Sequence, residues 1–212
     1  MKYLIIAIII VIPLKSIAQG YDLNIEIGTS ISNFSGDVNA TYSKYRAGLI
    51  LGIGIESPIK DKSGMKFGIL YEQKGQNFKG ESTTQNGSES YDNNMTLNYL
   101  TVPVTFKKYL GKKTIAFSGG LYGAVLLVST SNVNQTIING GSRSKLVIKN
   151  GDSKVNFKSN DVGLILATSI QPFEKFYIDV KSGWGLLNIA SDSNPRDEIK
   201  NHSIEILLGI ML

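Results

Sequence analysis

The feature that most constrains this chain is a strict two-residue alternation of apolar with polar or small side chains, repeated in segments of about ten residues. In the C-terminal segment, Ser203, Glu205 and Gly209 alternate with Ile204, Ile206, Leu208, Ile210 and Leu212. Because successive side chains of a strand point to opposite faces, this period indicates strands with one apolar face each. Such strands, joined by alternately long and short connections, predict an antiparallel barrel closed within a membrane.

The alternation predicts an all-β fold, an eight-stranded antiparallel up-and-down transmembrane β-barrel. The strands are expected near residues 21–32, 45–57, 65–75, 95–109, 114–129, 160–171, 176–188 and 203–212. Long polar joins are expected at 32–44, 76–94, 130–159 and 189–200, whereas the other three joins are short. Long joins outside and short turns on the periplasmic side are the arrangement of outer-membrane barrels.

Two local features add to this pattern. Residues 145–149 (Lys-Leu-Val-Ile-Lys) lie in the longest join, and we expect them to pair as a hairpin that extends the barrel outward. Pro103 lies inside the fourth strand and donates no ladder hydrogen bond, so we expect a bulge or a kink there.

The N-terminus has the features of a secretory signal peptide at residues 1–18. Lys2 precedes an apolar run at residues 3–14, and Ser16-Ile17-Ala18 supplies the small residues that signal peptidase requires before Gln19. The alternative is a retained N-terminal anchor helix. Cleavage leaves residues 19–212 as one outer-membrane β-barrel domain, and export places it in the bacterial outer membrane.

Composition excludes some partners and sites. The chain has no Cys, which excludes disulfides and thiolate metal sites. The formal net charge is +5, and removal of Lys2 and Lys15 with the leader lowers it to +3. A charge this small does not indicate a nucleic-acid partner.

The face opposite the aliphatic one carries charges that identify it as the lumen. These residues are Glu26, Arg46, Glu56, Lys66, Glu72, Lys74, Asp161, Asp179, Lys181 and Glu205. Burying them in an apolar cavity, as in a soluble lipid-binding barrel, would be very costly, whereas a polar interior can pair acids with bases. We therefore expect a polar, filled lumen with a charge network. An ion or proton path along these carboxylates is the alternative, although eight strands leave little room for a wide pore.

Aromatic side chains sort to both ends of the aliphatic face. Those beside the short turns are Phe67, Phe106, Phe117 and Phe176, and those beside the long joins are Tyr45, Tyr71 and Trp184. This placement predicts membrane-interface aromatics in two girdles. The preference of aromatic residues for strands explains their presence, but it does not explain their sorting to the two ends.

Four segments resemble the PorT-type outer-membrane β-barrel family of Bacteroidota. They are Leu70-Tyr71-Glu72-Gln73-Lys74-Gly75, Asn98-Tyr99-Leu100-Thr101-Val102-Pro103-Val104, Ser159-Asn160-Asp161-Val162-Gly163-Leu164 and Ser182-Gly183-Trp184-Gly185-Leu186-Leu187-Asn188-Ile189. Their order and spacing cover most of residues 19–212. The resemblance implies an outer-membrane barrel of a Gram-negative bacterium. Because some members of the family are linked to type IX secretion and gliding, it also implies a component of a secretion apparatus as one function.

Residues for catalysis are scarce. His202 is the single histidine, and its neighbour Ser203 points to the opposite face of a strand, so a Ser-His-acid arrangement is not expected. Zinc and haem sites lack ligands, and the acidic stretch at 192–198 lacks the glycine and spacing of an EF-hand. We expect no catalytic residue, no metal and no cofactor.

The sequence thus predicts a non-enzymatic integral outer-membrane protein that acts as a membrane scaffold. Its expected partners are outer-membrane lipid, the barrel-assembly machinery during biogenesis, and a protein bound at the extracellular loops. The alternatives are a narrow transport channel or a component of a type IX-like secretion apparatus. A lipid-modifying outer-membrane enzyme that uses His202 is less favoured.

Overall fold

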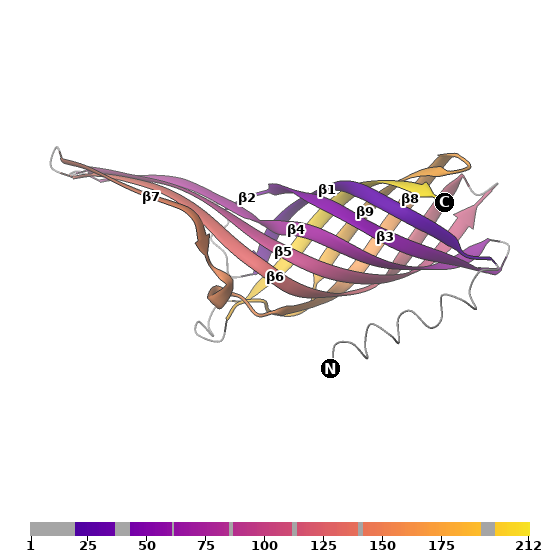
Figure 1. Ribbon diagram of the computed structural model, residues 1–212. Helices are drawn as coiled ribbons and strands as arrows, with labels where there is room; N and C mark the ends of the chain where they lie inside the picture. The colour runs from indigo at the N-terminus through magenta and orange to yellow at the C-terminus, as the bar shows by residue number, and fades with distance from the viewer. Residues whose placement is uncertain are drawn as a thin grey trace.

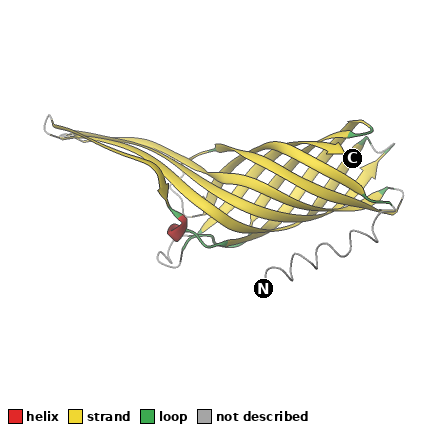
Figure 2. Ribbon diagram, in the orientation of Figure 1, coloured by secondary structure: helices red, strands yellow, loops and turns green. Residues whose placement is uncertain are grey.

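The computed structural model describes residues 20–36, 43–60, 62–84, 87–111, 114–139, 142–191 and 198–212. The predicted signal peptide at 1–18 and its cleavage site lie outside the described residues, as does most of the acidic stretch at 192–198. The rest is almost entirely strand, with one short 3-10 helix, η2 (Lys154–Asn156), among the described residues (Figure 2).

Eight strands form the predicted closed ring, and the all-β antiparallel barrel is confirmed (Figure 1). In ring order they are β1 (Asp22–Gly36), β3 (Arg46–Lys60), β4 (Ser63–Thr84), β5 (Gly87–Leu110), β6 (Ile115–Asn139), β8 (Asn160–Phe173), β9 (Phe176–Gly185) and β10 (Ile199–Met211). The ring closes where β1 pairs with β10, from Asn24 opposite Met211 to Gly36 opposite Ile199. Two further strands, β2 (Ser43–Lys44) and β7 (Ser142–Asp152), pair with β4 and β6 outside the ring.

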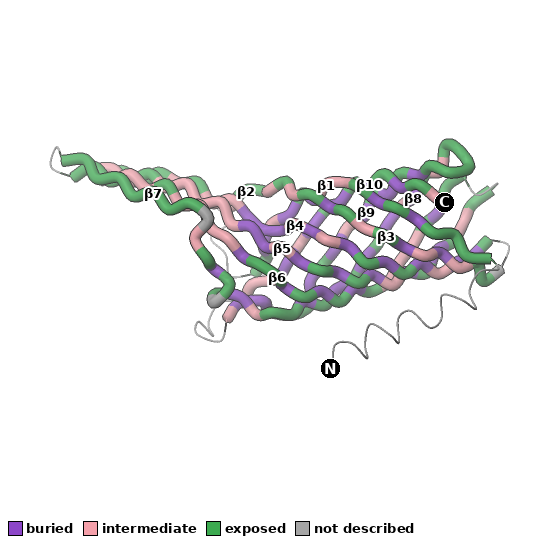
Figure 3. The backbone as a smooth tube through the Cα atoms, in the orientation of Figure 1, coloured by how far each residue is buried: buried purple, intermediate pink, exposed green. Residues whose placement is uncertain are grey.

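Burial alternates along every ring strand, as the sequence pattern predicts (Figure 3). On β3, Leu49 and Leu51 are each 42% exposed, whereas Ile50 between them is fully buried. The outward side chains form an apolar belt around the cylinder, far larger than the patches that soluble monomers expose to water. An apolar belt of this kind contacts the hydrocarbon of a lipid bilayer.

The two ends of the barrel differ. The connections β3–β4, β5–β6 and β8–β9 are short and lie together at one end, where the C-terminus also lies (Figure 1). At the other end, β4, β5, β6 and β7 continue past the ring as a long projecting sheet. We call this projection the blade and define it as residues 76–84, 87–95, 130–139 and 142–152.

The blade corrects the sequence prediction. The join at 76–94 was expected to be a loop, but β4 and β5 pair without a change of register from Ser63 opposite Lys108 to Thr84 opposite Gly87. The join at 130–159 is largely strand as well, and the hairpin predicted around residues 145–149 is confirmed as β7 on β6. The prediction failed because Ser, Asn and Gly dominate these stretches and conceal their alternation, although the ladder hydrogen bonds continue.

The irregularity predicted at Pro103 is a gap in the β4–β5 ladder, whereas the bulge of this strand lies a few residues away. The register between β5 and β6 shifts between Asn98 and Tyr99, and Leu127 is the extra residue on β6. Pro103 keeps its place opposite Tyr122, while the β4–β5 ladder lacks pairs at Gly68 and Ile69. The proline ring packs toward Gly68, so a residue without a side chain accommodates it in place of a bulge.

None of the described residues forms a helix long and apolar enough to cross a membrane.

Arginine on the outward face should test which face meets lipid. Leu51→Arg places a charge on the apolar belt, and we expect it to cost about 2–4 kcal/mol if residue 51 lies near the bilayer midplane. Ser90→Arg, on an exposed position of the blade, should fold like the parent protein. The measurement is the folded fraction in lipid vesicles, read from the electrophoretic shift between unheated and heated samples. Equal folded fractions for the two variants would contradict the assignment of the belt to lipid.

Candidate functional site

The lumen is packed with polar and charged side chains that come from all eight ring strands. Among its most buried members are Asn24, Glu26, Ser30, Glu72, Thr101, Asp161, Ser169, Asp179 and Ser203. Buried charges are stable only when paired and hydrogen-bonded, so the contacts of these groups decide what the interior can do.

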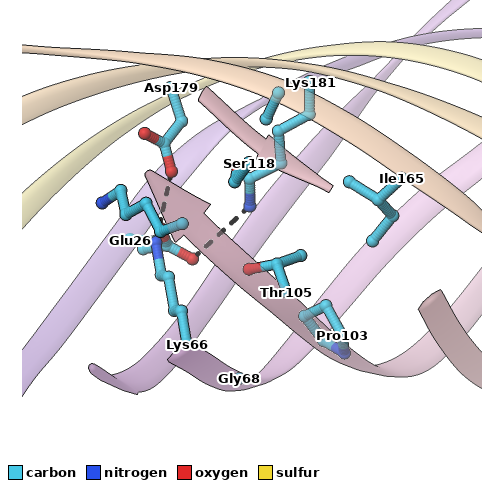
Figure 4. Close-up of a pocket in the computed structure, with 11 residues that line it drawn as sticks. Glu26, Lys66, Gly68, Pro103, Thr105, Ser118, Ile165, Asp179 and Lys181 are labelled. Atoms are coloured by element: carbon cyan, nitrogen blue, oxygen red, sulfur yellow. Dashed lines mark hydrogen bonds and ion pairs between the residues drawn. The ribbon is translucent and has the colours of Figure 1, made fainter. Parts of the chain in front are cut away.

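A first cluster lies around Lys66 of β4 (Figure 4). The Lys66 ammonium donates to Glu26 of β1, and its Nζ lies 3.2 Å from Asp179 Oδ2 of β9. Lys181 Nζ approaches the second oxygen of Glu26 at 3.7 Å. Tyr177 completes the cluster, because its hydroxyl donates to Glu26 Oε1 at 2.8 Å and lies 3.1 Å from Lys66 Nζ. Two lysines and two carboxylates thus balance one another.

A second cluster lies around Lys74, whose side chain is 3% exposed. Its Nζ lies 3.0 Å from Glu72 Oε2 and 4.0 Å from Glu205 Oε1, and it sits 4.6 Å above the ring of Tyr122. Hydroxyl groups donate to the same carboxylate oxygens that Lys74 approaches. Thr101 donates to Glu72 Oε2 at 2.8 Å, and Ser203 donates to Glu205 Oε1 at 2.8 Å.

Two smaller groups occupy the ends of the lumen. Toward the blade, Asp161 Oδ2 accepts hydrogen bonds from the Tyr122 hydroxyl at 2.9 Å and from Asn201 Nδ2 at 2.8 Å. Toward the short turns, Glu56 pairs with Lys107 at 2.9 Å and accepts a hydrogen bond from the Tyr109 hydroxyl. The network therefore runs along the whole lumen.

Most of the charged residues expected in the lumen are buried there, with one exception. Glu26, Glu56, Lys66, Glu72, Lys74, Asp161, Asp179, Lys181 and Glu205 are all buried. Arg46 is only half-buried and forms no ion pair with any described residue. Its Nε donates to Asn94 Oδ1 at 3.3 Å near the rim. Sequence reasoning also missed Lys107, although the alternation that places Thr105 inward places Lys107 inward as well.

Tyrosine rings fill the lumen where a facing strand has glycine. Gly163 lies opposite Tyr122, and Gly209 lies opposite Tyr177. A Cβ at either glycine would overlap the facing ring. The interior glycines thus give space to large side chains that carry the hydroxyl groups of the network.

The lumen is filled and covered. A cavity beside Glu26, Lys66 and Thr105 has a volume of about 20 Å³, room for about one water molecule. At the blade end an apolar cluster covers the network, with Phe34, Leu97, Leu126, Phe157 and Ile189 all buried. Phe157 lies in the segment after η2, bridges to Ala190, and packs on Phe34 with ring centroids 5.9 Å apart. This segment lies across the mouth of the barrel.

The expected interface aromatics all lie on the outward face. Tyr45, Phe67, Phe106, Phe117, Phe176 and Trp184 are exposed. Tyr71 is partly exposed and donates its hydroxyl to Asn98 Oδ1 at 2.7 Å. Phe67, Phe106, Phe117 and Phe176 lie near the short turns, and the others lie toward the blade.

The single histidine is not placed for acid–base chemistry with its neighbour. His202 lies on the outward face, 6.2 Å from Trp184 between ring centroids, whereas Ser203 is buried in the lumen. No group of three or more described His, Cys, Asp or Glu side chains is placed to hold a metal ion. What the arrangement offers chemically is a largely paired and hydrogen-bonded interior, in which Asp161 Oδ1 is one of a few buried atoms without a hydrogen-bond partner among the described residues, and a large surface on the blade.

Comparison with known proteins agrees with this geometry. The family model described as "Outer membrane protein beta-barrel domain" matches residues 17–191. The chain belongs to this outer-membrane β-barrel family. It is therefore an integral protein of the bacterial outer membrane, as the sequence predicts. No curated protein sequence matches the chain.

Solved structures resemble this outer-membrane barrel in fold. Neisserial surface protein A has a TM-score of 0.50 at 10% identity, over 91% of this chain and 99% of that one. The attachment invasion locus protein Ail of Yersinia pestis has a TM-score of 0.48 at 11% identity, over 92% and 100%. OprG of Pseudomonas aeruginosa has a TM-score of 0.38 at 12% identity, over 91% and 96%.

Removing one buried acid should destabilise the barrel more than removing an exposed one. Glu26→Gln leaves Lys66 and Lys181 short of a counter-charge, and breaking a buried pair typically costs about 3–5 kcal/mol. The control Asp92→Asn breaks the pair with Lys79, whose side chain is 51% exposed, and should cost at most about 1 kcal/mol. Urea unfolding in vesicles, followed by the fluorescence of Trp184, the single tryptophan, measures both. Equal shifts of the two midpoints would show that water already screens the lumen charges.

The tyrosine–glycine contacts give a second stability prediction. Gly209→Ala forces a methyl group against the Tyr177 ring and should destabilise the barrel by about 1–3 kcal/mol. Gly123→Ala is the matched control, since nothing lies within 4 Å of the added Cβ. The same urea titration compares them. If Gly209→Ala is as stable as Gly123→Ala, the ring of Tyr177 does not need the space above Gly209.

Proposed function

We propose that this protein is a closed, non-enzymatic anchor that holds the blade at the cell surface as a site for a protein partner. The observation that carries the proposal is the contrast between the two parts of the molecule. The lumen is filled by paired charges and covered by an apolar cluster, whereas β4, β5 and β6 continue outward and form the blade together with β7. The blade lies outside the membrane, where a partner can reach it.

In this proposal the lumen charges are structural. Lys66 and Lys74 lie within ion-pair or hydrogen-bond distance of Glu26, Asp179 and Glu72, so these acids hold the two bases in place. A narrow channel is the second reading, because a chain of carboxylates runs along the lumen from Glu56 to Asp161. The tightness of the packing around these groups favours the structural role.

The absence of catalysis is part of the proposal. His202 and Ser203 lie on opposite faces of β10, so the chemistry of a serine hydrolase lacks its general base. The outward aromatic residues act in this view as two interfacial girdles that fix the depth of the barrel in the bilayer. Lipid is then a permanent partner and not a substrate.

We further propose that the chain falls in the PorT-type branch of its family, from a member of the Bacteroidota. The four sequence segments that resemble that branch support this assignment. Export by a signal peptide cleaved before Gln19 and folding by the barrel-assembly machinery follow from the same reading. Membership of a secretion apparatus is the form of partner binding that the branch suggests.

Single-channel recording tests the anchor directly. Purified protein reconstituted in planar bilayers should show no stepwise conductance above that of the bare lipid. Vesicles that contain the parent protein and vesicles that contain His202→Ala should show the same absence of phospholipid turnover. Discrete conductance steps would favour the channel, and turnover lost in His202→Ala would favour the enzyme.

A further inference from the structure

The two faces of the blade reverse the polarity of the barrel wall. Since the β4–β5 ladder keeps its register, the lumen-facing side of the wall continues as the inner face of the blade. That inner face carries Phe78, Tyr91, Val133, Ile137, Leu146 and Ile148, together with the polar Glu89, Asn93 and Gln135. The outer face carries Asn77, Lys79, Asp92, Asn94, Asn134, Thr136, Arg143 and Lys145, together with the apolar Ile138 and Val147. The lipid-facing side of the wall is thus replaced by a mainly polar face once the strands leave the membrane.

The two edges of the blade differ in chemistry. Beyond Phe78, the outer edge of β4 carries Lys79, Gly80 and Glu81, whose mixed charges discourage the addition of another strand. The opposite edge of the blade is β7, which pairs only with β6 among the described residues. Its centre is Leu146-Val147-Ile148, and these side chains are 50%, 44% and 41% exposed. The unpaired backbone groups of such an edge are a template for strand pairing, while Lys145 and Lys149 on either side of it discourage an added strand that lacks complementary charges.

The charges on β7 indicate what a pairing strand should carry. Arg143 and Lys145 share the outer face, and neither forms an ion pair with any described residue. Their cross-strand neighbours on β6 are Ile138 and Thr136, which carry no charge. By contrast, Lys79 on the same face of the blade lies 2.7 Å from Asp92 on the adjacent strand. Among the described residues, the edge of β7 away from β6 is where an acidic cross-strand neighbour of Arg143 and Lys145 could be added.

We propose that the open edge of β7 binds an extended polypeptide segment that alternates apolar and acidic residues, as a fifth strand of the blade. The backbone groups of β7 supply the ladder, as in other cases of strand addition. The apolar side chains of the added segment continue the inner face beside Leu146 and Ile148. Its carboxylates pair with Arg143 and Lys145 across the outer face. This inference rests on the proposed function and names the chemistry of the partner.

Synthetic peptides provide the test. Two short labelled peptides, one alternating Val with Glu and one alternating Val with Lys, are titrated against the full protein in lipid nanodiscs, and binding is followed by fluorescence anisotropy. We expect the Val/Glu peptide to bind at least about tenfold more tightly than the Val/Lys peptide. Amide hydrogen exchange should slow at residues 143–149 and remain unchanged at residues 79–83, the other edge of the blade.

Charge reversal gives the matched variants. Arg143→Glu with Lys145→Glu should reverse the preference, so that the Val/Lys peptide binds more tightly. Glu81→Lys, on the opposite edge, should leave the preference of the parent protein unchanged. Lys145→Gln removes one charge without reversing it and should weaken Val/Glu binding by a smaller factor. The electrophoretic shift reports whether each variant folds. If the double variant does not fold, Lys145→Gln alone tests the site.

The outcomes separate the inference from the function on which it rests. Equal binding of the two peptides, protection at residues 79–83 in place of β7, or an unchanged preference in the folded charge variants would overturn the β7 site. The anchor function stands in those cases if the bilayer remains non-conducting. Conductance steps in the planar bilayer overturn the anchor function whether or not the peptide binds.

Discussion

The whole structure depends on one requirement, that no backbone N–H or C=O group is left without a partner in hydrocarbon. A sheet meets this requirement only when its first and last strands pair, and here β1 and β10 do so along thirteen residue positions. Closure fixes the direction of every side chain. Aliphatic residues must then point outward, and the charges that share those strands must point into a narrow space where they have to satisfy one another. Lys66 with Glu26 and Lys74 with Glu72 are consequences of the closed ladder as much as of their own attraction.

The sequence predicts the barrel well because closure within lipid requires the alternation of apolar and polar residues that the sequence shows. Period two is printed directly in segments such as residues 203–212, and it places Glu26, Lys66 and Asp179 on the inner face without any knowledge of their neighbours. It cannot predict which acid meets which base. That depends on how far each strand is shifted against the next, and a single extra residue such as Leu127 changes the match. Tyr122 and Tyr177 follow the alternation too, but their contacts with lysines appear only in three dimensions.

Two predictions failed for different reasons. Arg46 follows the alternation and still pairs with β1 opposite Ser32, but it lies beyond the last β3–β4 pair, Ile50 opposite Glu72. It therefore lies at the rim and is only half-buried. The blade was overlooked because its outer face must meet water and is therefore polar, which removes the apolar half of the signal. What remains is the inner face with Val133, Ile137 and Leu146, spread over strands far apart in sequence. A polarity pattern thus identifies a strand clearly when one face meets lipid and the other a polar lumen, and less clearly when the outer face meets water.

The β4–β5 pairing, which keeps one register from Ser63 to Thr84, also determines how far the molecule extends from the membrane. β5 contains 24 residues and at about 3.3 Å each spans about 80 Å, from the short-turn end of the barrel to the far part of the blade. The same covalent strands pass from water into the bilayer without a hinge at the boundary. The barrel and the blade are therefore parts of one continuous sheet, and the far end of the blade is held away from the membrane.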